Sequence, residues 1–297
     1  MKYVIGVDSG GTHIVGQALT LSGSILAQTQ SGPGNILLDQ SQTLINLKTV
    51  LTNLLIKLGE SDCEYILMGI AGVETTGNSE SIAKSFTSSL KIPTYVVSDA
   101  QLALLNGLEG QDGTLIIAGT GSVIYGRQNQ QLLRFGGWGN LLGDTGSAYK
   151  IVATAMEKML HDYDLGHPGQ LEPILLPALK ATNPKQAVQK YYQLSRKEVA
   201  ALAVLIATAA DDKNPEAISV LEAQAQALAN EALGLIGRYQ HPYPDKLALS
   251  GSVLVHNHFY RQILIDQLHA TYPELETIVV ATNNARGAIF WRKWHQE

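Results

Sequence analysis

Residues 3–19 read YVIGVDSGGTHIVGQAL and contain an apolar run, a glycine-rich turn and a second apolar run. The two runs, Tyr3–Val7 and Ile14–Leu19, have the composition of buried strands, and the DSGGT turn at Asp8–Thr12 is short enough to join them as a hairpin. Ser24–Gln30 predicts a third strand after another tight turn. The sequence therefore begins with three strands joined in order.

The same pattern returns at residues 114–127, TLIIAGTGSVIYGR, where the turn Gly119–Ser122 separates the expected strands Thr114–Ala118 and Val123–Arg127. Gln131–Phe135 is the expected third strand of this copy. Helical and strand spacings then alternate after each set of three. An internal duplication of this kind predicts an α/β fold of two similar domains that face a cleft, with one glycine turn on each wall.

The expected domain boundaries follow from this duplication. Residues 1–112 form the expected N-terminal domain and residues 113–284 the expected C-terminal domain, with the final helix at 285–297 packing back on the first. A helical insertion at about residues 160–240 interrupts the second copy, and its longest mostly apolar run, Val199–Ala210, predicts a buried helix. That run is shorter than the ~20 residues needed to cross a bilayer. The last expected elements are a helix at Val253–Ala270, a strand at Thr277–Ala281 and a helix at Ala285–His295.

Composition limits the classes of function. The chain has 297 residues, of which 45% are apolar and 16% charged, and its net charge is −5, which argues against disorder and against a basic nucleic-acid surface. Cys63 is the only cysteine, so an internal disulfide and a cysteine-built zinc or iron–sulfur site are excluded. The N-terminal residues lack a signal-peptide pattern, and we expect a protein of the reducing cytoplasm without a membrane or nucleic-acid partner.

The first glycine turn has the composition of a phosphate-binding site. Gly10 and Gly11 leave backbone N–H groups open to an anion, and Thr12 adds a hydroxyl. Asp8, at the end of a buried strand, can hold Mg²⁺ directly or through water. Taken alone, the turn also fits an ordinary hairpin.

The second turn, AGTGS at Ala118–Ser122, occupies the equivalent place in the second copy. Thr120, Gly121 and Ser122 would form a backbone and hydroxyl cradle for phosphate. Two such turns at equivalent places of a duplicated fold are harder to explain as simple hairpins than either one alone. The pair therefore predicts a phosphate-binding site.

Asp99 follows an apolar strand and opens a helix. A carboxylate at the carboxyl end of a strand lies where ligands bind in α/β sheets, and it can accept a proton from an attacking hydroxyl. The alternative is that Asp99 only caps its helix.

Three further glycine-containing stretches are candidates for ligand contact. GGWGNLLGDTGS at Gly136–Ser147 indicates close backbone approach, and Asp144 within it either caps the next helix or binds a ligand hydroxyl. Asn35 follows the turn SGPG and is either a sugar contact or a routine turn residue. Gly251, in LALSGS at Leu247–Ser252, would let a nucleotide lie against the backbone.

Several common motifs are absent from the sequence. It has no GxxxxGK[ST], no GxGxxG after its first strand, no HExxH and no GxSxG. These absences argue against a P-loop, a Rossmann dinucleotide site, a zinc protease and a serine hydrolase.

Together the motifs resemble those of the superfamily of acetate and sugar kinases, heat-shock chaperones and actin. DSGGT resembles its first phosphate motif, AGTGS the second, LALSGS the adenosine motif, and IAG at Ile70–Gly72 the interdomain connector. The most specific stretch, GGWGxxxGDxGSA at Gly136–Ala148, resembles the N-acetylglucosamine kinase branch, which is grouped with the BadF/BadG-type ATPases. This resemblance implies two ribonuclease H-like (actin-like ATPase) domains.

The resemblance also implies an activity, the phosphorylation of N-acetylglucosamine on its 6-hydroxyl by MgATP. Asp99 would be the general base and Asp8 would serve Mg²⁺. The implied sugar contacts are Asn35, Asp99, Asp144 and the backbone at Gly136 and Gly137. The implied ATP contacts are Gly10, Gly11, Thr12, Thr120, Gly121, Ser122, Gly251 and Ser252.

One departure from the family pattern leaves the sugar open. Many relatives have glutamate where this chain has Thr145, so the sugar preference can differ. The alternatives are a kinase for glucosamine, N-acetylmuramic acid or a plain hexose, an ATP-driven activator of a partner protein, and a non-catalytic sugar sensor. The helical insertion also offers a surface for a homodimer.

Overall fold

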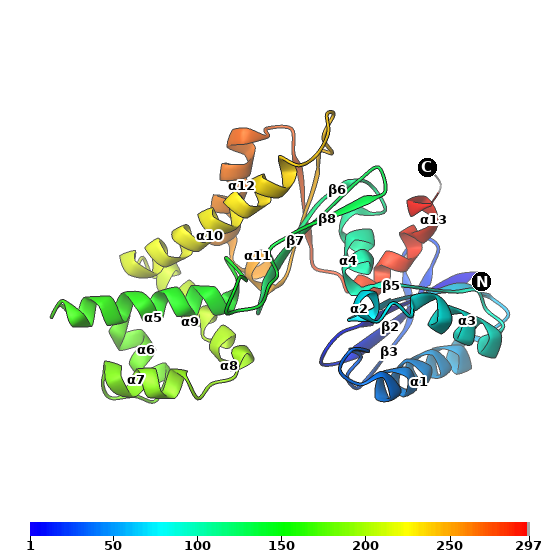
Figure 1. Cartoon of the computed structure of the whole chain (residues 1–297), viewed down its shortest axis with the longest axis horizontal. Helices are drawn as coiled ribbons and strands as arrows, with labels where there is room; N and C mark the ends of the chain where they lie inside the picture. The colour runs from blue at the N-terminus through cyan, green and yellow to red at the C-terminus, as the bar shows by residue number, and fades with distance from the viewer. Residues whose placement is uncertain (296–297) are drawn as a thin grey trace. The chain divides into compact units, whose positions relative to one another are not determined.

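The computed structural model describes residues 1–295 and divides the chain into two compact units (Figure 1). Unit 1 consists of Met1–Asp112 and the segment from Ala281 onward, and unit 2 is Gly113–Val280. The chain therefore passes between the units twice, after Asp112 and after Val280.

Unit 1 is built on a five-stranded mixed sheet in the order β3-β2-β1-β4-β5. The first three strands pair antiparallel, as hairpins must, whereas β4 and β5 add in parallel to β1. The strands are β1 (Tyr3–Ser9), β2 (Ile14–Thr20), β3 (Ile25–Ser31), β4 (Cys63–Ile70) and β5 (Thr94–Ser98).

Helices of unit 1 pack on its sheet. Leucines and valines along α1 join the core formed with β1, β2 and β4, and Asp39 caps the helix by accepting from the Gln42 N–H. Gly6 of β1 faces the backbone of Ala285, so a side chain at position 6 would collide with the last helix. The helices are α1 (Gln40–Leu58), α2 (Val73–Thr76), α3 (Ser79–Leu90), α4 (Asp99–Leu108), the 3₁₀ helix η1 (Asn284–Phe290) and α13 (Trp291–Trp294).

Unit 2 repeats the sheet of unit 1 strand for strand. Its order is β10-β9-β6-β7-β8, with antiparallel β6-β7-β8 and with β9 and β10 parallel to β6. The strands are β6 (Gly113–Ala118), β7 (Ser122–Gln128), β8 (Gln131–Phe135), β9 (Lys246–Ser250) and β10 (Glu276–Val280). This equivalence confirms the duplicated α/β fold expected from the two glycine turns.

The extra helices of unit 2 lie between β8 and β9, where unit 1 has only α1 between β3 and β4. They are α5 (Ala148–Asp164), α6 (Glu172–Ala178), α7 (Pro184–Tyr191), α8 (Arg196–Ala201), α9 (Ala203–Asp211) and α10 (Pro215–Ile236). Two more, α11 (Ser252–His256) and α12 (His258–Thr271), lie between β9 and β10. In Figure 1, α12 lies beside α10.

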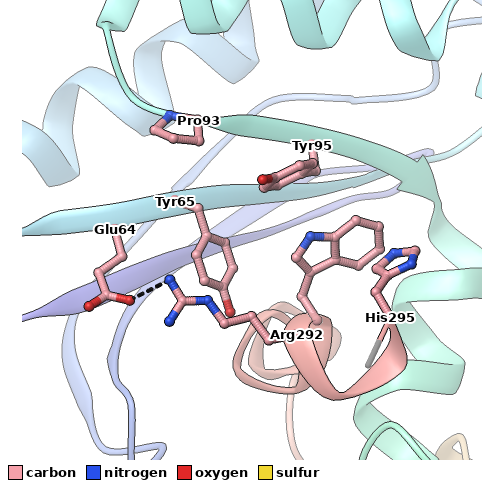
Figure 2. A pocket seen from close by; sticks show the side chains of 7 residues that line it. Glu64, Tyr65, Pro93, Tyr95, Arg292 and His295 are labelled. Atoms are coloured by element: carbon pink, nitrogen blue, oxygen red, sulfur yellow. Dashed lines mark ion pairs between the residues drawn. The ribbon is translucent and has the colours of Figure 1, made fainter. Parts of the chain in front are cut away.

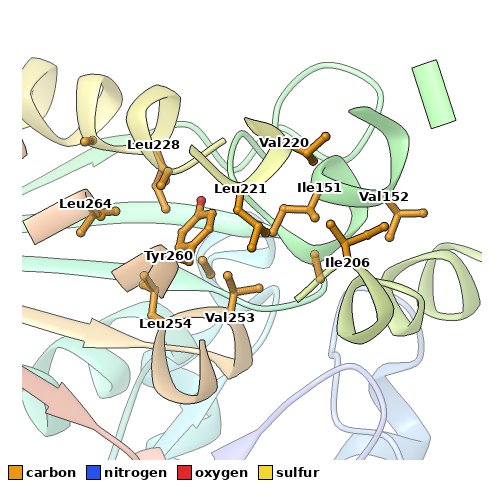
Figure 3. Close-up of a cluster of buried hydrophobic side chains, with 14 of the residues drawn as sticks. Ile151, Val152, Ile206, Val220, Leu221, Leu228, Val253, Leu254, Tyr260 and Leu264 are labelled. Carbon is orange, nitrogen blue, oxygen red and sulfur yellow. The ribbon is translucent and has the colours of Figure 1, made fainter. Parts of the chain in front are cut away.

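Apolar side chains from these helices form one continuous core. Figure 3 shows Ile151 of α5, Leu221 and Leu228 of α10, and Tyr260 and Leu264 of α12 gathered in it. The helical segment is thus packed on the sheet of unit 2. None of the helices described has both the length and the apolar character needed to cross a bilayer.

Three expected helices differ from the structure. The run Val199–Ala210 is broken at Leu202 into α8 and α9, and Val204 is 67% exposed, so the prediction of one buried helix is wrong. The expected helix Val253–Ala270 is broken at Asn257, whose side chain accepts from Tyr260 N and starts α12. The final helix is largely 3₁₀, which aligns residues three apart and lets Ala285 and Ala288 pack on the same line.

Tyr260 ties the glycine-rich loop before α5 to the helical core. Its side chain is fully buried, and its hydroxyl lies 2.8 Å from Gly146 O and 3.0 Å from Gln224 O. Gln224 Oε1 also accepts from Gly146 N at 3.1 Å. The backbone of the GDTGS turn is therefore held from both sides.

We expect Tyr260→Phe to lower the free energy of unfolding by about 1–2 kcal/mol, because the buried carbonyls lose their donor. Tyr243→Phe is the matched control, since its hydroxyl donates to Glu274 at an exposed site, and its effect should stay within about 0.5 kcal/mol. Thermal unfolding of the two variants makes the comparison. Equal losses would show that the Gly146 contact contributes nothing specific.

Candidate active site

Unit 1 collects several predicted site residues at one edge of its sheet. The parallel strands β1, β4 and β5 end at this edge, which is where α/β sheets bind ligands. Asp8 is the penultimate residue of β1, and Asp99 follows β5 directly as the first residue of α4. A backbone bridge between Asn35 and Ala71 brings Asn35 to the end of β4.

Asp99 does not cap its helix. The cap is Ser98, whose hydroxyl accepts from Gln101 N at 3.2 Å, while Gln101 Oε1 accepts from Ser98 N at 3.0 Å. Asp99 Oδ1 accepts from Ala100 N at 3.0 Å, and the residue is exposed. The capping alternative is therefore wrong, and the carboxylate remains accessible to a ligand.

The two carboxylates interact through their charges. Burial raises the pKa of Asp8 to about 6 and the charge of Asp99 adds to this, whereas His13 and a hydrogen bond with Asn284 oppose it. The pKa of Asp99 is also raised, chiefly because the protein around the carboxyl displaces water, with a further contribution from Glu74. Both groups therefore hold a proton more readily than an ordinary aspartate.

This edge fits a magnesium ion that brings most of its own ligands. Among residues 1–295, no cluster of three or more His, Cys, Asp or Glu side chains forms a ready metal cage. Mg²⁺ usually takes only one or two carboxylates and completes its octahedron with waters and substrate phosphates. Asp8, a desolvated carboxylate beside a second one, has the chemistry of such a ligand.

The first glycine turn is exposed and internally fixed. Gly10 N donates to His13 O at 3.1 Å, and Gly10 O accepts from Gly34 N at 2.8 Å. Thr12 Oγ1 lies 2.9 Å from His13 Nδ1. A Cβ added at Gly11 would meet no atom within 4 Å, and the φ of Gly11 is not positive. Nothing in the fold thus requires glycine at position 11.

Asn35 is held by the residues that were expected to connect the domains. Its Oδ1 accepts from Leu37 N at 3.0 Å, and a Cβ on Gly72 would come within 2.7 Å of the same oxygen. The IAG segment Ile70–Gly72 lies inside unit 1, where it runs from the last residue of β4 to the residue before α2, so its assignment as the interdomain connector is wrong. Its backbone instead shapes the surroundings of Asn35.

The second glycine turn lies in unit 2 between β6 and β7. Thr120 at its tip is exposed, whereas the Ser122 hydroxyl is buried and donates to Thr145 O at 2.7 Å. Gly119 O accepts from Ala148 N at 2.8 Å, so the turn is also joined to the start of α5. Because the Ser122 hydroxyl is already donating, any phosphate contact from Ser122 would have to come from its backbone.

The predicted nucleotide residues Gly251 and Ser252 pack on this turn. Gly251 has a φ of 92°, and a Cβ there would overlap the Ala118 backbone. Ser252 N lies 3.7 Å from where a Cβ on Gly119 would stand. Glycine at position 251 is therefore needed for strand packing, independently of any nucleotide.

The glycine-rich loop after β8 is organised by Arg134. Its guanidinium donates to Gly136 O at 3.2 Å and to Gly137 O at 2.5 Å, and it lies 4.6 Å from the centre of the Trp138 ring. Trp138 is 67% exposed and therefore lies outside the core. Both glycines have positive φ, as the sharp path of the loop requires.

Asp144 is the most enclosed of the predicted sugar contacts. Its side chain is 3% exposed, and its Oδ2 accepts from Arg196 Nη2 at 2.6 Å. Ser147 caps α5, so the suggestion that Asp144 caps this helix is wrong. A cavity of about 240 Å³ brings Asp144 and Arg196 together with Gly121, Ser122 and Gly137.

Sequence patterns missed several polar residues beside these sites. Asn284 opens η1 in the run TNNARG, and Arg196 follows the N-cap serine of α8. Arg134 lies in β8, two residues before Gly136 of the glycine loop. The sequence could have indicated only Arg134, because it is close to that loop along the chain. Asn284 and Arg196 reach their sites through tertiary packing.

A cavity of about 640 Å³ lies elsewhere in unit 1 (Figure 2). Figure 2 shows the ion pair between Arg292 and Glu64 and the rings of Tyr65 and Tyr95. The ion pair joins Arg292 Nη2 and Glu64 Oε2 at 2.8 Å, and the Tyr95 ring also packs against the ring of Trp291. These residues lie at the beginnings of β4 and β5 and on α13, at the opposite end of the strands from Asp99. The cavity is accordingly part of the contact that holds α13 to the sheet.

Comparisons with known proteins agree with this fold. A model of the BadF/BadG/BcrA/BcrD ATPase family matches residues 5–291, and the chain belongs to this family. The expected resemblance is thereby confirmed.

Individual relatives are similar over most of the chain. An N-acetylmuramic acid/N-acetylglucosamine kinase of Clostridium acetobutylicum is 31% identical over 307 residues, which cover 97% of each chain. An N-acetyl-D-glucosamine kinase of Dictyostelium discoideum is 31% identical over 218 residues, covering 64% of this chain and 68% of the relative. The solved structure of a candidate N-acetylglucosamine kinase from Porphyromonas gingivalis has a TM-score of 0.72 at 20% identity, over 99% of this chain and all of that one.

The raised pKa of Asp8 predicts a pH-dependent stability. A carboxyl whose pKa rises on folding contributes stability below its unfolded pKa and loses it as pH rises through the folded value, here from about 4 to about 6. Without metal, Asp8→Asn should therefore be more stable than the wild type at pH 8, by about 1–3 kcal/mol. Thermal unfolding in EDTA at pH 4.5 and pH 8 tests this, and an equal difference at both pH values would contradict it.

The two glycine turns predict opposite responses to alanine. Gly11→Ala should leave thermal unfolding unchanged, because its Cβ meets nothing, yet weaken ADP and ATP binding at least about tenfold if phosphate approaches the turn. Gly121→Ala should destabilise the fold, because its Cβ would come within 2.8 Å of the buried Asp144 carboxylate as well as overlap the Arg196 guanidinium. Calorimetric titration and thermal unfolding separate the two effects. Normal nucleotide affinity in Gly11→Ala would remove this turn from the site.

Proposed function

We propose that this protein transfers the γ-phosphoryl group of MgATP to the 6-hydroxyl of N-acetylglucosamine, with Asp99 as the general base. The observation that carries the proposal is the position of Asp99 at the carboxyl edge of the sheet, beside Asp8. Asp99 is exposed there, and its carboxylate does not cap the helix. The class itself, an ATP-dependent sugar kinase, agrees with the ATPase family and with the kinases among its relatives.

Asp99 has the properties that a base for this reaction needs. Its carboxylate is accessible, and its raised pKa makes it a better proton acceptor near neutral pH than an ordinary aspartate. In the proposed step the sugar oxygen attacks the γ-phosphorus as its proton passes to Asp99. The bond from phosphorus to the β-phosphate bridging oxygen breaks, and ADP leaves with the electron pair.

The phosphates are assigned to the glycine turns. Gly10, Gly11 and Thr12 in unit 1 and Thr120, Gly121 and Ser122 in unit 2 would supply mainly backbone N–H groups, with Gly251 and Ser252 beside the nucleotide. Bound Mg²⁺ would neutralise phosphate charge, and Asp8 would hold it. The catalytic benefit then comes chiefly from positioning and charge stabilisation.

The sugar is assigned to Asn35 and Asp99 of unit 1 and to Asp144 and the backbone of Gly136 and Gly137 in unit 2. Asn35 and the glycine backbone are already fixed by internal hydrogen bonds, which lowers the entropy cost of binding. Thr145 stands where many relatives have glutamate, and it shares the Ser122 contact. Its neighbourhood is therefore where the sugar preference would be set.

N-acetylmuramic acid is the second candidate substrate. The relative from Clostridium acetobutylicum, which matches over 97% of each chain, is named for both sugars. N-acetylmuramic acid adds a carboxylate to the same ring, and two arginines, Arg134 and Arg196, line the cavity beside the glycine loop. Positive charge near the sugar is compatible with either substrate.

The decisive experiment measures ADP release with MgATP against N-acetylglucosamine, N-acetylmuramic acid, N-acetylmannosamine, glucosamine, glucose and no sugar. We expect the two N-acetylated sugars named for the relatives to give the fastest release, with N-acetylglucosamine first. ADP release that is equal without sugar would overturn the proposal and favour a partner-activated ATPase.

Asp99→Asn should lower kcat at least about a hundredfold, because it removes the proton acceptor. The affinity for ADP should change little, since Asp99 is assigned to the sugar hydroxyl. Asp112→Asn, a carboxylate near the passage between the units, serves as a charge-matched control with near-normal turnover. Near-normal kcat in Asp99→Asn would refute the role of base.

A further inference from the structure

Arg196 reaches the second glycine turn from the helical segment of unit 2. It is the first residue of α8, and its Nη2 lies 2.6 Å from Asp144 Oδ2. The partners differ in exposure, since the Asp144 side chain is 3% exposed and that of Arg196 is 45% exposed. The buried carboxylate thus fixes one edge of a guanidinium whose remainder faces solvent.

The turn itself is shaped to admit this guanidinium. A Cβ at Gly121 would overlap Arg196 Nη2 and come within 2.8 Å of Asp144 Oδ2. Glycine at position 121 therefore lets the ion pair lie directly on the backbone of the turn.

Arg196 keeps donors for a second partner. A guanidinium carries five N–H groups, and within residues 1–295 the polar contact that Arg196 makes is with Asp144. Its cavity of about 240 Å³ is also lined by Gly121, Ser122 and Gly137. The cavity thus joins the turn assigned to phosphate with the loop assigned to sugar.

We propose that Arg196 binds the γ-phosphoryl group of ATP as it passes to the sugar, and that Asp144 positions the guanidinium for this contact. This inference rests on the function proposed above. A phosphoryl group in transfer spreads negative charge over three equatorial oxygens, which the planar N–H fork of arginine can contact in pairs. Arg196 lies where the turn assigned to phosphate meets the loop assigned to sugar. We therefore assign it to the transferred γ-phosphoryl group and not to the α- or β-phosphate.

The first test is turnover with saturating N-acetylglucosamine. Arg196→Met should lower kcat by about 10²–10³-fold, the usual effect of losing one donor to transition-state charge, while KM for the sugar changes less than about threefold. Arg196→Lys should recover part of the rate, and guanidinium chloride should partly rescue Arg196→Ala. Lys197→Met, which removes the neighbouring positive charge from the exposed face of α8, is the control and should behave like the wild type.

The second test is binding without turnover. Calorimetric titration compares ADP with AMPPNP, an ATP analogue that retains a γ-phosphoryl group. Arg196→Met should lose at least about tenfold in AMPPNP affinity and almost none in ADP affinity, a difference of about 1.4 kcal/mol. Equal losses for both nucleotides, or no loss for either, would overturn the proposal.

The two tests distinguish this inference from the proposed function. If the wild type shows no sugar-dependent turnover but Arg196→Met selectively loses AMPPNP, the sugar-kinase proposal fails and the phosphoryl contact stands. If turnover is normal in Arg196→Met, the contact fails and the kinase proposal stands. A rise in KM restricted to N-acetylmuramic acid, with kcat for N-acetylglucosamine unchanged, would instead assign Arg196 to the sugar carboxylate and overturn the phosphoryl role.

Discussion

Parallel pairing of three strands in each unit is the constraint on which the rest of the structure depends. In unit 1, β4 and β5 lie parallel to β1, so the chain leaves all three strands at the same edge. Strand direction alone therefore brings residues that are far apart in sequence, such as Asp8 and Asp99, to the same edge. Unit 2 repeats the arrangement with β6, β9 and β10, which brings Gly251 against the turn that follows Ala118.

This convergence carries an electrostatic cost at the edge of unit 1. Two carboxylates interact there, and both have pKa values above the ordinary range, Asp8 mainly through burial. Folding alone would favour an amide at either position. The partners assigned to Asp8 and Asp99 are a cation and a sugar hydroxyl, and each would stabilise the carboxylate that it binds. Carboxylates with perturbed pKa values are common at functional sites.

Unit 2 meets a different requirement, because its helical segment has to hold a glycine loop in one conformation. Tyr260 and Gln224 fix Gly146 from the helices, Ser122 fixes Thr145 from the sheet, and Arg196 reaches Asp144 from α8. The loop is thereby attached to both layers of the unit. The helices inserted between β8 and β9 thus shape the site as well as the core.

The sequence by itself determined the duplicated α/β fold and its two glycine turns, because short apolar runs separated by tight turns are local signals. The capping box that Ser195 and Glu198 form at the start of α8 is an equally local feature. Only the tertiary structure decided that Ser98 and not Asp99 caps α4, that Ile70–Gly72 lies within unit 1, and that Arg196 meets Asp144 on the backbone of Gly121. These contacts depend on how strands and helices pack, and side chains 52 residues apart, such as Arg196 and Asp144, leave no periodic trace in the sequence.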